Sequence, residues 1–194
     1  GTITENNMSL AKIFSLKSSK ITDLETDLNA DEKALIALSM WASEPIPFDP
    51  MEIALHKEYA KIIEKDERSQ YKMIHEYPLS GKPPMMTHIF ESKDTTIIAA
   101  KGAPEALIAI SKLSDSEKNH IQNAIKELTN EGYRILAVAE SNFEGKNFPK
   151  TQQEFHFDFK GLVAFYDPPK KNINVVLEHF YKAGISVKII TGDN

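Results

Sequence analysis

The stretch that decides the fold reads Thr95-Thr96-Ile97-Ile98-Ala99-Ala100-Lys101-Gly102-Ala103-Pro104. Its first part has the β-branched and apolar content of a strand, and Pro104 is suited to the first turn of a helix, which is expected to run through Ile110. Segments 71–77 and 88–91 have similar strand content, and the turn-forming residues 81–84 lie between them. The middle of the chain is therefore expected to form a sheet rich in hairpins.

The helices around these strands are predicted from their first residues. Three starts carry a capping signal: Asn29 with Glu32, Asp49 with Pro50, and Ser114 with Glu117. The helices that follow are expected to end near residues 42, 65 and 130, and residues 133–140 are expected to form a further strand. This part of the chain therefore reads as an antiparallel sheet flanked by helices.

The C-terminal tail has a different pattern. Residues 161–166 form an apolar run, which Asp167-Pro168-Pro169 ends. Residues 172–183 have apolar side chains at helical spacing, and residues 185–190 look like a second apolar strand. A helix followed by a strand at this length is half of a βαβ unit, so a parallel sheet is expected for the tail. Two subdomains of different α/β architecture are predicted.

The composition excludes several classes of protein. The 194 residues include 23 Lys and Arg against 28 Asp and Glu, and 41% are hydrophobic, as in an ordinary globular protein of one large or two small domains. The acidic balance argues against nucleic acid as the main partner. There are no cysteines, which excludes disulfides and cysteine nucleophiles. No apolar run approaches the roughly 20 residues needed to cross a bilayer.

Five residues are candidates for chemistry. Lys101 and Gly102 lie where a strand passes into a helix, a place that favours an anion such as phosphate, and the alternative is a solvated lysine in a turn. Glu52, in the first turn of a capped helix, could instead satisfy a backbone amide. Arg134 could reach a phosphate or pair with a neighbouring carboxylate. Asp193 follows a strand of the expected parallel sheet, at the edge where α/β folds bind ligands.

Several familiar signatures are absent. Ser80-Gly81-Lys82 lacks the first glycine of a P-loop and is followed by Pro83 in place of Ser or Thr. No dinucleotide-binding glycine pattern and no catalytic serine arrangement occur. The histidines at 56, 75, 88, 120, 156 and 179 have no metal-ligand spacing, so we expect them to pack in the core or on the surface and expect no metal site from them.

Taken together, short motifs in the chain resemble those of the type II P-type cation-transporting ATPases, the group that includes the calcium pumps. The motifs are Gly1-Thr2-Ile3-Thr4, Asp49-Pro50-Met51-Glu52-Ile53-Ala54-Leu55, Lys101-Gly102-Ala103-Pro104-Glu105, Gly132-Tyr133-Arg134-Ile135-Leu136-Ala137, Asp167-Pro168-Pro169 and Thr191-Gly192-Asp193-Asn194. They occur in the family's order over the whole chain, and the Lys101–Glu105 motif is the most specific of the middle ones. The chain is thus expected to be a segment of a longer protein.

The resemblance implies two domains. Residues 7–169 would form the nucleotide-binding domain, an antiparallel sheet with helices. Residues 1–6 and 170–194 would be parts of the phosphorylation domain, a haloacid-dehalogenase-like parallel sheet. The family's phosphoryl-accepting aspartate would lie just before Gly1, so this segment alone is not expected to turn over ATP.

The resemblance also assigns roles to single residues. Glu52 would contact adenine, Lys101 would line the adenine and phosphate pocket, and Arg134 would reach the phosphates. The implied nucleotide site is completed by Leu79, Gly102 and Asp167. Thr191 and Gly192 would hold the transferred phosphoryl group, and Asp193 would lie near the nucleotide.

One motif departs from the family's pattern. Where the family often has Phe-Ser-x-x-Arg-Lys, with the phenylalanine stacking on adenine, this chain has Leu79-Ser80-Gly81-Lys82-Pro83-Pro84. Tyr77 or Lys82 would have to compensate. Stacking on an aromatic ring contributes about 1–3 kcal/mol, so ATP affinity is expected near millimolar, roughly −4 kcal/mol.

The expected function is therefore that of an ATP-binding cytoplasmic segment of a cation pump. Its cofactors would be ATP and Mg²⁺, and its partners the transmembrane and actuator domains of the parent chain, at the cytoplasmic face of a membrane, with the segment itself monomeric. A non-catalytic interaction module that kept the fold is the alternative. A free-standing phosphatase of the haloacid-dehalogenase class would need an aspartate nucleophile on its first strand, and the sequence has none.

Overall fold

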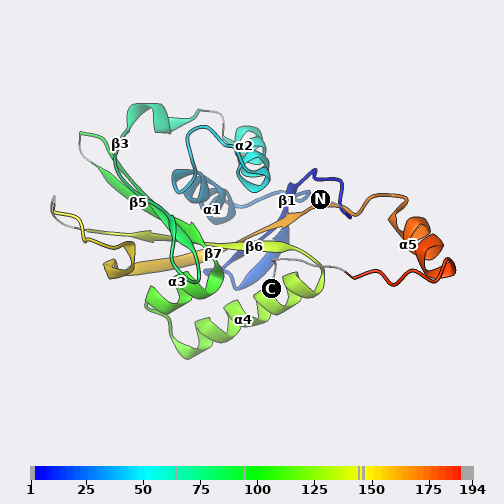
Figure 1. Ribbon diagram of the computed structural model, residues 1–194. Coiled ribbons are helices and arrows are strands. Elements are labelled where there is room, and N and C mark those ends of the chain that lie inside the picture. Colours follow the sequence, from blue (N-terminus) through cyan, green and yellow to red (C-terminus); the bar gives the residue numbers. More distant parts are fainter. Residues whose placement is uncertain (1–2, 64, 94, 144, 146, 189–194) are drawn as a thin grey trace. The chain divides into compact units, whose positions relative to one another are not determined.

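The computed structural model describes residues 3–63, 65–93, 95–143, 145 and 147–188 (Figure 1). The chain divides into two compact units. The larger unit is Met8–Tyr166, and the smaller combines the two chain ends, 1–7 and 167–194. We describe each unit by itself.

The larger unit is built on one antiparallel sheet. Its strands are β1 (Ser9–Ser15), β2 (Lys20–Asp23), β3 (Lys72–Ser80), β4 (Met85–Glu91), β5 (Thr96–Gly102), β6 (Arg134–Ser141) and β7 (Phe157–Tyr166). They lie in the order β2-β1-β7-β6-β5-β4-β3, and every neighbouring pair is antiparallel. Its helices are α1 (Ala30–Trp41), α2 (Pro50–Ile62), α3 (Pro104–Ile110) and α4 (Asp115–Asn130), with short 3-10 turns at Glu67–Gln70 and Gln152–Glu154.

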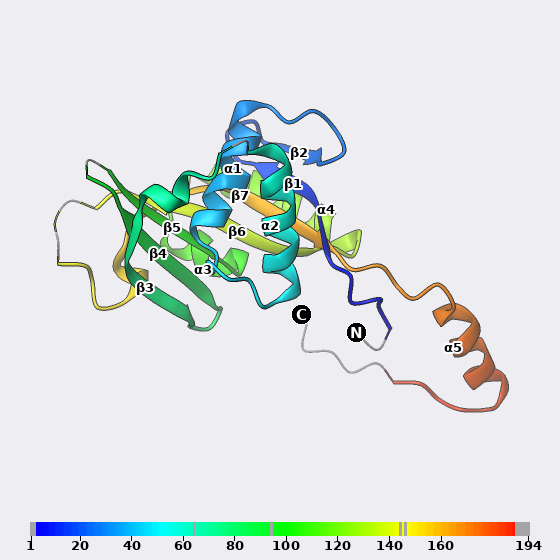
Figure 2. The ribbon, with the colours of Figure 1, turned by 90° about the horizontal axis from the view of Figure 1, so that it is seen from above.

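Helices cover both faces of the sheet. Helices α1 and α2 lie on one face and α3 and α4 on the other (Figures 1 and 2). The interior strand β7 alternates accordingly: Val163 and Phe165 belong to the core beneath α1 and α2, and Leu162 and Ala164 to the core beneath α3 and α4. Because both faces are covered, this strand is apolar at successive positions whatever the direction of its neighbours.

The predicted helix starts are confirmed. Asn29 and Ser114 each form a reciprocal capping box with the glutamate three residues later. Asp49 accepts the amides of Met51 and Glu52, with Pro50 in the first helical position. Helix α2 ends at Ile62, three residues earlier than expected.

Strands β1 and β2 were not expected from the sequence. In β1 the pairing register with β7 shifts between Leu10 and Lys12. The resulting bulge interrupts the two-residue alternation by which a half-buried strand is recognised.

In the smaller unit the two chain ends meet. Thr4 and Pro169 form an antiparallel bridge, and the amides of Glu5 and Lys170 donate to the carbonyls of Pro168 and Ile3, each at 2.9 Å. Helix α5 (Ile173–Lys182) forms as expected. Residues 185–188 form no strand, and the rest of the expected strand lies outside the described residues, so the parallel sheet of the tail stays a prediction.

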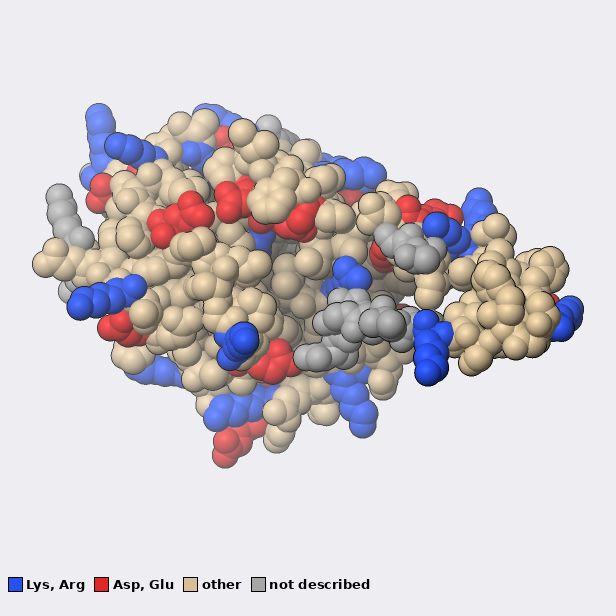
Figure 3. Space-filling model, in the orientation of Figure 1, with Lys and Arg blue, Asp and Glu red and all other residues tan. Residues whose placement is uncertain are grey.

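Charge is distributed over the surface. Figure 3 shows acidic and basic side chains interspersed over the face in view. Among the residues that the structure describes, no helix is both long and apolar enough to span a bilayer.

Candidate functional site

One pocket of the larger unit collects most of the predicted nucleotide-binding residues. It has a volume of about 80 Å³ and is lined by Asp49, Met51, Glu52, Leu55, Leu79, Met86, Lys101, Gly102, Leu136 and Phe165. Four of these, Glu52, Leu79, Lys101 and Gly102, are predicted site residues that come from α2, β3 and β5. The fold therefore brings together side chains that lie far apart in the sequence.

Lys101 is the polar centre of this pocket. Its ammonium group donates to Oε1 of Glu52 at 2.5 Å and to Oγ of Ser43 at 2.7 Å. The residue as a whole is only 4% exposed. The alternative of a solvated lysine in a turn is therefore wrong, because Lys101 lies within strand β5, between its register partners Met86 and Val138.

The expected anion site at the start of helix α3 is also not formed. Lys101 points to Glu52 on α2, whereas the seven-residue helix α3 packs in the core on the opposite face of the sheet. The ammonium group and the helix start are thus separated by the sheet. Alternate side chains of a strand point to opposite faces of the sheet. The Lys101 side chain and helix α3 therefore lie on opposite faces although they are close in the sequence.

The carboxylate of Glu52 makes two interactions. Besides the ion pair with Lys101, Oε1 accepts the backbone amide of Glu44 at 3.2 Å. The predicted satisfaction of a backbone amide therefore occurs, but with the segment between α1 and α2 and not within α2. The second oxygen, Oε2, is buried and has no hydrogen-bond partner among the described residues. It is an acceptor that a ligand donor could use.

Burial and charge act against each other on Lys101. Removal from water lowers the pKa of the Lys101 ammonium, and the hydrogen bond and negative charge of Glu52 oppose this effect. Burial likewise lowers the pKa of the nearby His56 imidazole, whose Nε2 lies 3.1 Å from the carbonyl of Glu44. The surroundings of the pair are therefore largely dehydrated.

Gly102 is required by the packing of the sheet. A Cβ at this position would lie 2.6 Å from Cα of Met85 and 2.6 Å from the carbonyl oxygen of Pro84. The amide of Ala103 donates to that same carbonyl at 2.8 Å. The glycine thus permits the close approach of β4 to β5 at the edge of the pocket.

Leu79 stands at the mouth of the pocket. It is 64% exposed, on β3. Tyr77 does not replace the missing aromatic ring, because it is buried in the core beneath α3 and α4 and donates its hydroxyl to the carbonyl of Pro149. The pairing register of β3 with β4 shifts between Tyr77 and Ser80, and this shift separates the side chain of Tyr77 from that of Leu79. Lys82 is exposed and is not part of the pocket wall.

The remaining predicted residues lie outside this pocket. Arg134 is the exposed first residue of β6, on the same face as the pocket residue Leu136 and opposite Phe165 in the register. Asp167 belongs to the smaller unit, where its Oδ1 accepts the amide of Asn7 at 3.1 Å. Thr191, Gly192 and Asp193 lie outside the described residues.

Sequence reasoning missed several pocket residues. Met86, Leu136 and Phe165 of the pocket wall read as ordinary core positions, and Ser43, the hydrogen-bond partner of Lys101, reads as a helix-end position. Which of them faces the pocket depends on strand register and on the position of α2, and neither leaves a local signal.

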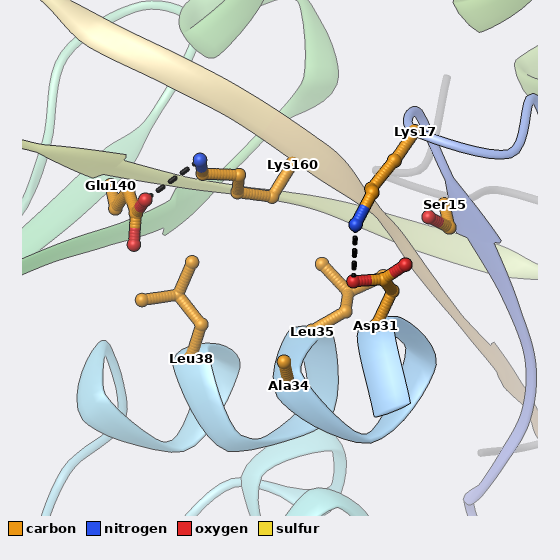
Figure 4. A pocket seen from close by; sticks show the side chains of 8 residues that line it. All are labelled: Ser15, Lys17, Asp31, Ala34, Leu35, Leu38, Glu140 and Lys160. Carbon is orange, nitrogen blue, oxygen red and sulfur yellow. Dashed lines mark hydrogen bonds and ion pairs between the residues drawn. The ribbon is translucent and has the colours of Figure 1, made fainter. Parts of the chain in front are cut away.

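A second pocket lies between α1 and the strands beneath it (Figure 4). It has a volume of about 290 Å³, and Leu35 and Leu38 contribute its apolar wall. Its two lysines are already paired: Lys17 lies 2.8 Å from Asp31, and Lys160 lies 2.7 Å from Glu140. None of the predicted site residues lines it, so the smaller pocket around Lys101 is the better candidate.

Most of the chain matches a known protein family. The family described as P-type ATPase, cytoplasmic domain N, matches residues 46–172. The chain belongs to the P-type ATPases. The match includes every residue that lines the Lys101 pocket, and it includes Arg134 and Asp167.

The similar curated proteins are also P-type ATPases. This chain is 29% identical to a probable cation-transporting P-type ATPase of Mycoplasma genitalium, over 100% of the chain and 22% of that protein. It is 27% identical to calcium-transporting ATPase 1 of Bacillus cereus and 24% identical to calcium-transporting ATPase 1 of Saccharomyces cerevisiae, again over 100% of the chain, and covers 24% and 25% of these proteins. The P-type ATPase segment thus spans about a quarter of the length of such relatives, and the resemblance inferred from its motifs is confirmed.

Proposed function

We propose that the larger unit binds ATP in the pocket around Lys101 and Glu52 and presents it for phosphoryl transfer within a cation-transporting P-type ATPase. The observation that carries the proposal is the buried ion pair that these two residues form in the wall of that pocket. A buried lysine beside apolar walls suits a ligand with a flat aromatic part and an anionic part.

Each part of the pocket has a counterpart in the nucleotide. The apolar side chains of Leu55, Met86 and Phe165 would cover the base. The unpartnered Oε2 of Glu52 would accept the adenine amino group. Lys101 and Arg134 would contact the phosphates, because Arg134 lies on the same face of β6 as the pocket residue Leu136.

The same pocket supports weak binding. Its volume of about 80 Å³ is well below the roughly 300–1,000 Å³ of sites that enclose a whole ligand. Leu79 offers an exposed aliphatic surface where an aromatic ring would stack on the base. We therefore expect a Kd near millimolar, roughly −4 kcal/mol.

Transfer of the phosphoryl group would require parts outside the described residues. The acceptor would be an aspartate preceding Gly1, and Thr191, Gly192 and Asp193 would lie beside it in a haloacid-dehalogenase-like sheet formed by residues 1–6 and 170–194. Mg²⁺ would neutralise the phosphate oxygens. The pocket carboxylates do not fit as its ligands, because Asp49 caps α2 and Glu52 is paired with Lys101. The parent chain would supply transmembrane and actuator domains, with this part at the cytoplasmic face and monomeric.

An interaction module without nucleotide binding is the second candidate. It is favoured by the loss of the aromatic and basic residues in segment 79–84. It predicts that nucleotide leaves the Lys101 pocket unchanged.

A nucleotide titration followed by NMR separates the two. With ATP raised to several times the expected Kd, amide shifts are expected at Glu52, Leu79 and Lys101, and ADP should give the same set. The second pocket serves as an internal control, because Lys17 and Lys160 should not shift. Absence of shifts around Lys101 would favour the interaction module, and shifts confined to the second pocket would place the ligand there.

A further inference from the structure

Three side chains beside the Lys101 pocket converge outside the site described above. Glu44 comes from the segment between α1 and α2, Glu76 from β3, and His88 from β4. One carboxylate oxygen of each glutamate and one ring nitrogen of His88 all lie within 4.8 Å of one another. We call these three residues the Glu44 cluster.

His88 is the unusual member of the cluster. It is 0% exposed, and among the described residues neither Nδ1 nor Nε2 has a hydrogen-bond partner. Buried polar atoms are nearly always hydrogen-bonded, so a ring with two unused nitrogens calls for a ligand.

The charges around the cluster favour a cation. Oxygen atoms of the Glu44 and Glu76 carboxyl groups lie within 4.8 Å of each other. The nearby ammonium group of Lys101 is already paired with Glu52. Glu44 and Glu76 are thus two carboxylates facing each other, and their charge equals that of one divalent cation.

The fold holds the cluster from three directions. Glu76 and His88 are register partners across β3 and β4, which places their side chains side by side on the same face. Glu44 is held through its main chain, whose amide donates to Glu52 and whose carbonyl lies 3.1 Å from Nε2 of His56. Glu76 is exposed, so an ion can enter from its side.

We propose that Glu44, Glu76 and His88 bind a divalent transition-metal ion of the zinc class, with water at a fourth position. One imidazole and two carboxylates form a donor set that Zn²⁺ accepts in sites with an open position, whereas Mg²⁺ and Ca²⁺ prefer oxygen ligands throughout. Ligand atoms around zinc lie about 3.4 Å apart, so the three side chains must close by roughly an ångström when the ion binds.

This site is separate from the proposed nucleotide site and does not depend on it. The hydrogen bond from the Glu44 amide to Glu52 connects the two sites. Spacing in the sequence could not reveal the cluster, because its ligands come from three different elements.

The test is a titration of the 194-residue chain with Zn²⁺ and, as a spectroscopic probe, with Co²⁺. We expect one saturable site per chain, visible d–d absorption from bound Co²⁺, and no displacement by excess Mg²⁺. Nitrogen-15 shifts should assign the bound ring to His88. Binding of zinc only through exposed histidines, with the His88 ring unshifted, would overturn the proposal, as would the absence of a saturable site.

Variants separate the cluster from adventitious binding. Glu44→Gln, Glu76→Gln and His88→Gln should each weaken Zn²⁺ binding about tenfold or more, since even outer-shell losses cost 10–100-fold. His75→Gln is the matched control, because His75 is an exposed histidine of β3 outside the cluster, and it should bind as the unaltered chain does. The two glutamine replacements of glutamate keep the test valid if His88→Gln does not fold. Equal affinity in all the variants would contradict the site.

Discussion

The ammonium group of Lys101 lies 2.5 Å from Oε1 of Glu52, and each side chain is only 5% exposed. The two residues are 49 positions apart, on β5 and α2. A charge pair so far removed from water is held in place by its own interactions, because removal of either partner leaves the other charge buried alone. The pair therefore ties α2 to the sheet as well as lining the pocket.

Lys101→Met is expected to destabilise the chain by about 3–5 kcal/mol, because Glu52 would keep its charge in a dry site. Adding Glu52→Gln should recover a large part of this loss, since Gln keeps an acceptor for the Glu44 amide. Urea unfolding followed by the fluorescence of Trp41, the single tryptophan, measures both. If the double variant loses as much stability as the two single variants lose together, the pair does not act as a unit.

Leu79→Phe is expected to tighten ATP binding, given the proposed function. An aromatic ring at the mouth of the pocket would stack on the base and contribute about 1–3 kcal/mol, or about fivefold or more in Kd. Calorimetry or the NMR titration measures the change. Ile74→Phe is the control, because Ile74 is on the same strand but does not line the pocket. Equal effects of the two changes would argue against stacking at Leu79.

Gly102→Ala is expected to destabilise the fold itself, by about 1–3 kcal/mol, because the added methyl group would overlap the main chain of Met85 and Pro84. Denaturant unfolding without nucleotide measures this directly. Gly132→Asn serves as the comparison, since nothing lies within 4 Å of a Cβ there and Asn tolerates its φ of +85°. A Gly102→Ala chain of unchanged stability would show that the glycine serves the ligand alone.

Glu117 provides a test of pH dependence. Its carboxylate accepts from Oγ of Ser114 at 2.6 Å and from the Ser114 amide at 2.8 Å, and these hydrogen bonds lower the pKa of Glu117. The ionised form thus supports the start of α4 above the carboxyl's unfolded-state pKa, and this support is lost as pH falls through the lower folded-state value.

Ser114→Ala is expected to raise the pKa of Glu117 toward its ordinary value, as measured by NMR of the side-chain carboxyl carbon. Ser114→Thr keeps the hydroxyl and should preserve the shift. An unchanged pKa in Ser114→Ala would mean that the hydroxyl does not stabilise the carboxylate.

The parts of the fold that the sequence predicted are those governed by neighbouring residues. Caps at Asn29, Asp49 and Ser114 depend on groups three positions away, so they were readable without knowledge of the fold. Strand β1 was missed because a bulge broke its alternation. The apolar run 161–166 likewise did not show whether its strand pairs in a parallel or an antiparallel direction. Burial on both faces removes the apolar–polar alternation that is typical of an antiparallel strand.

The candidate site was predicted in its members but not in its arrangement. The motif around Lys101 indicated an important lysine. The helix that follows in this motif lies across the sheet from the ammonium group, and the partner of Lys101 is Glu52. His88 read as a packing residue, and only the register of β3 with β4 places it beside Glu76.

By itself the sequence determined the helix starts, the main middle strands and the family, because each rests on short runs of residues whose chemistry acts locally. Only the tertiary structure decided which faces of the strands meet α2, that Lys101 is buried against Glu52, and that Glu44 lies next to His88. These relationships depend on strand register and helix packing, which are set by contacts between residues tens of positions apart and leave no trace in local spacing.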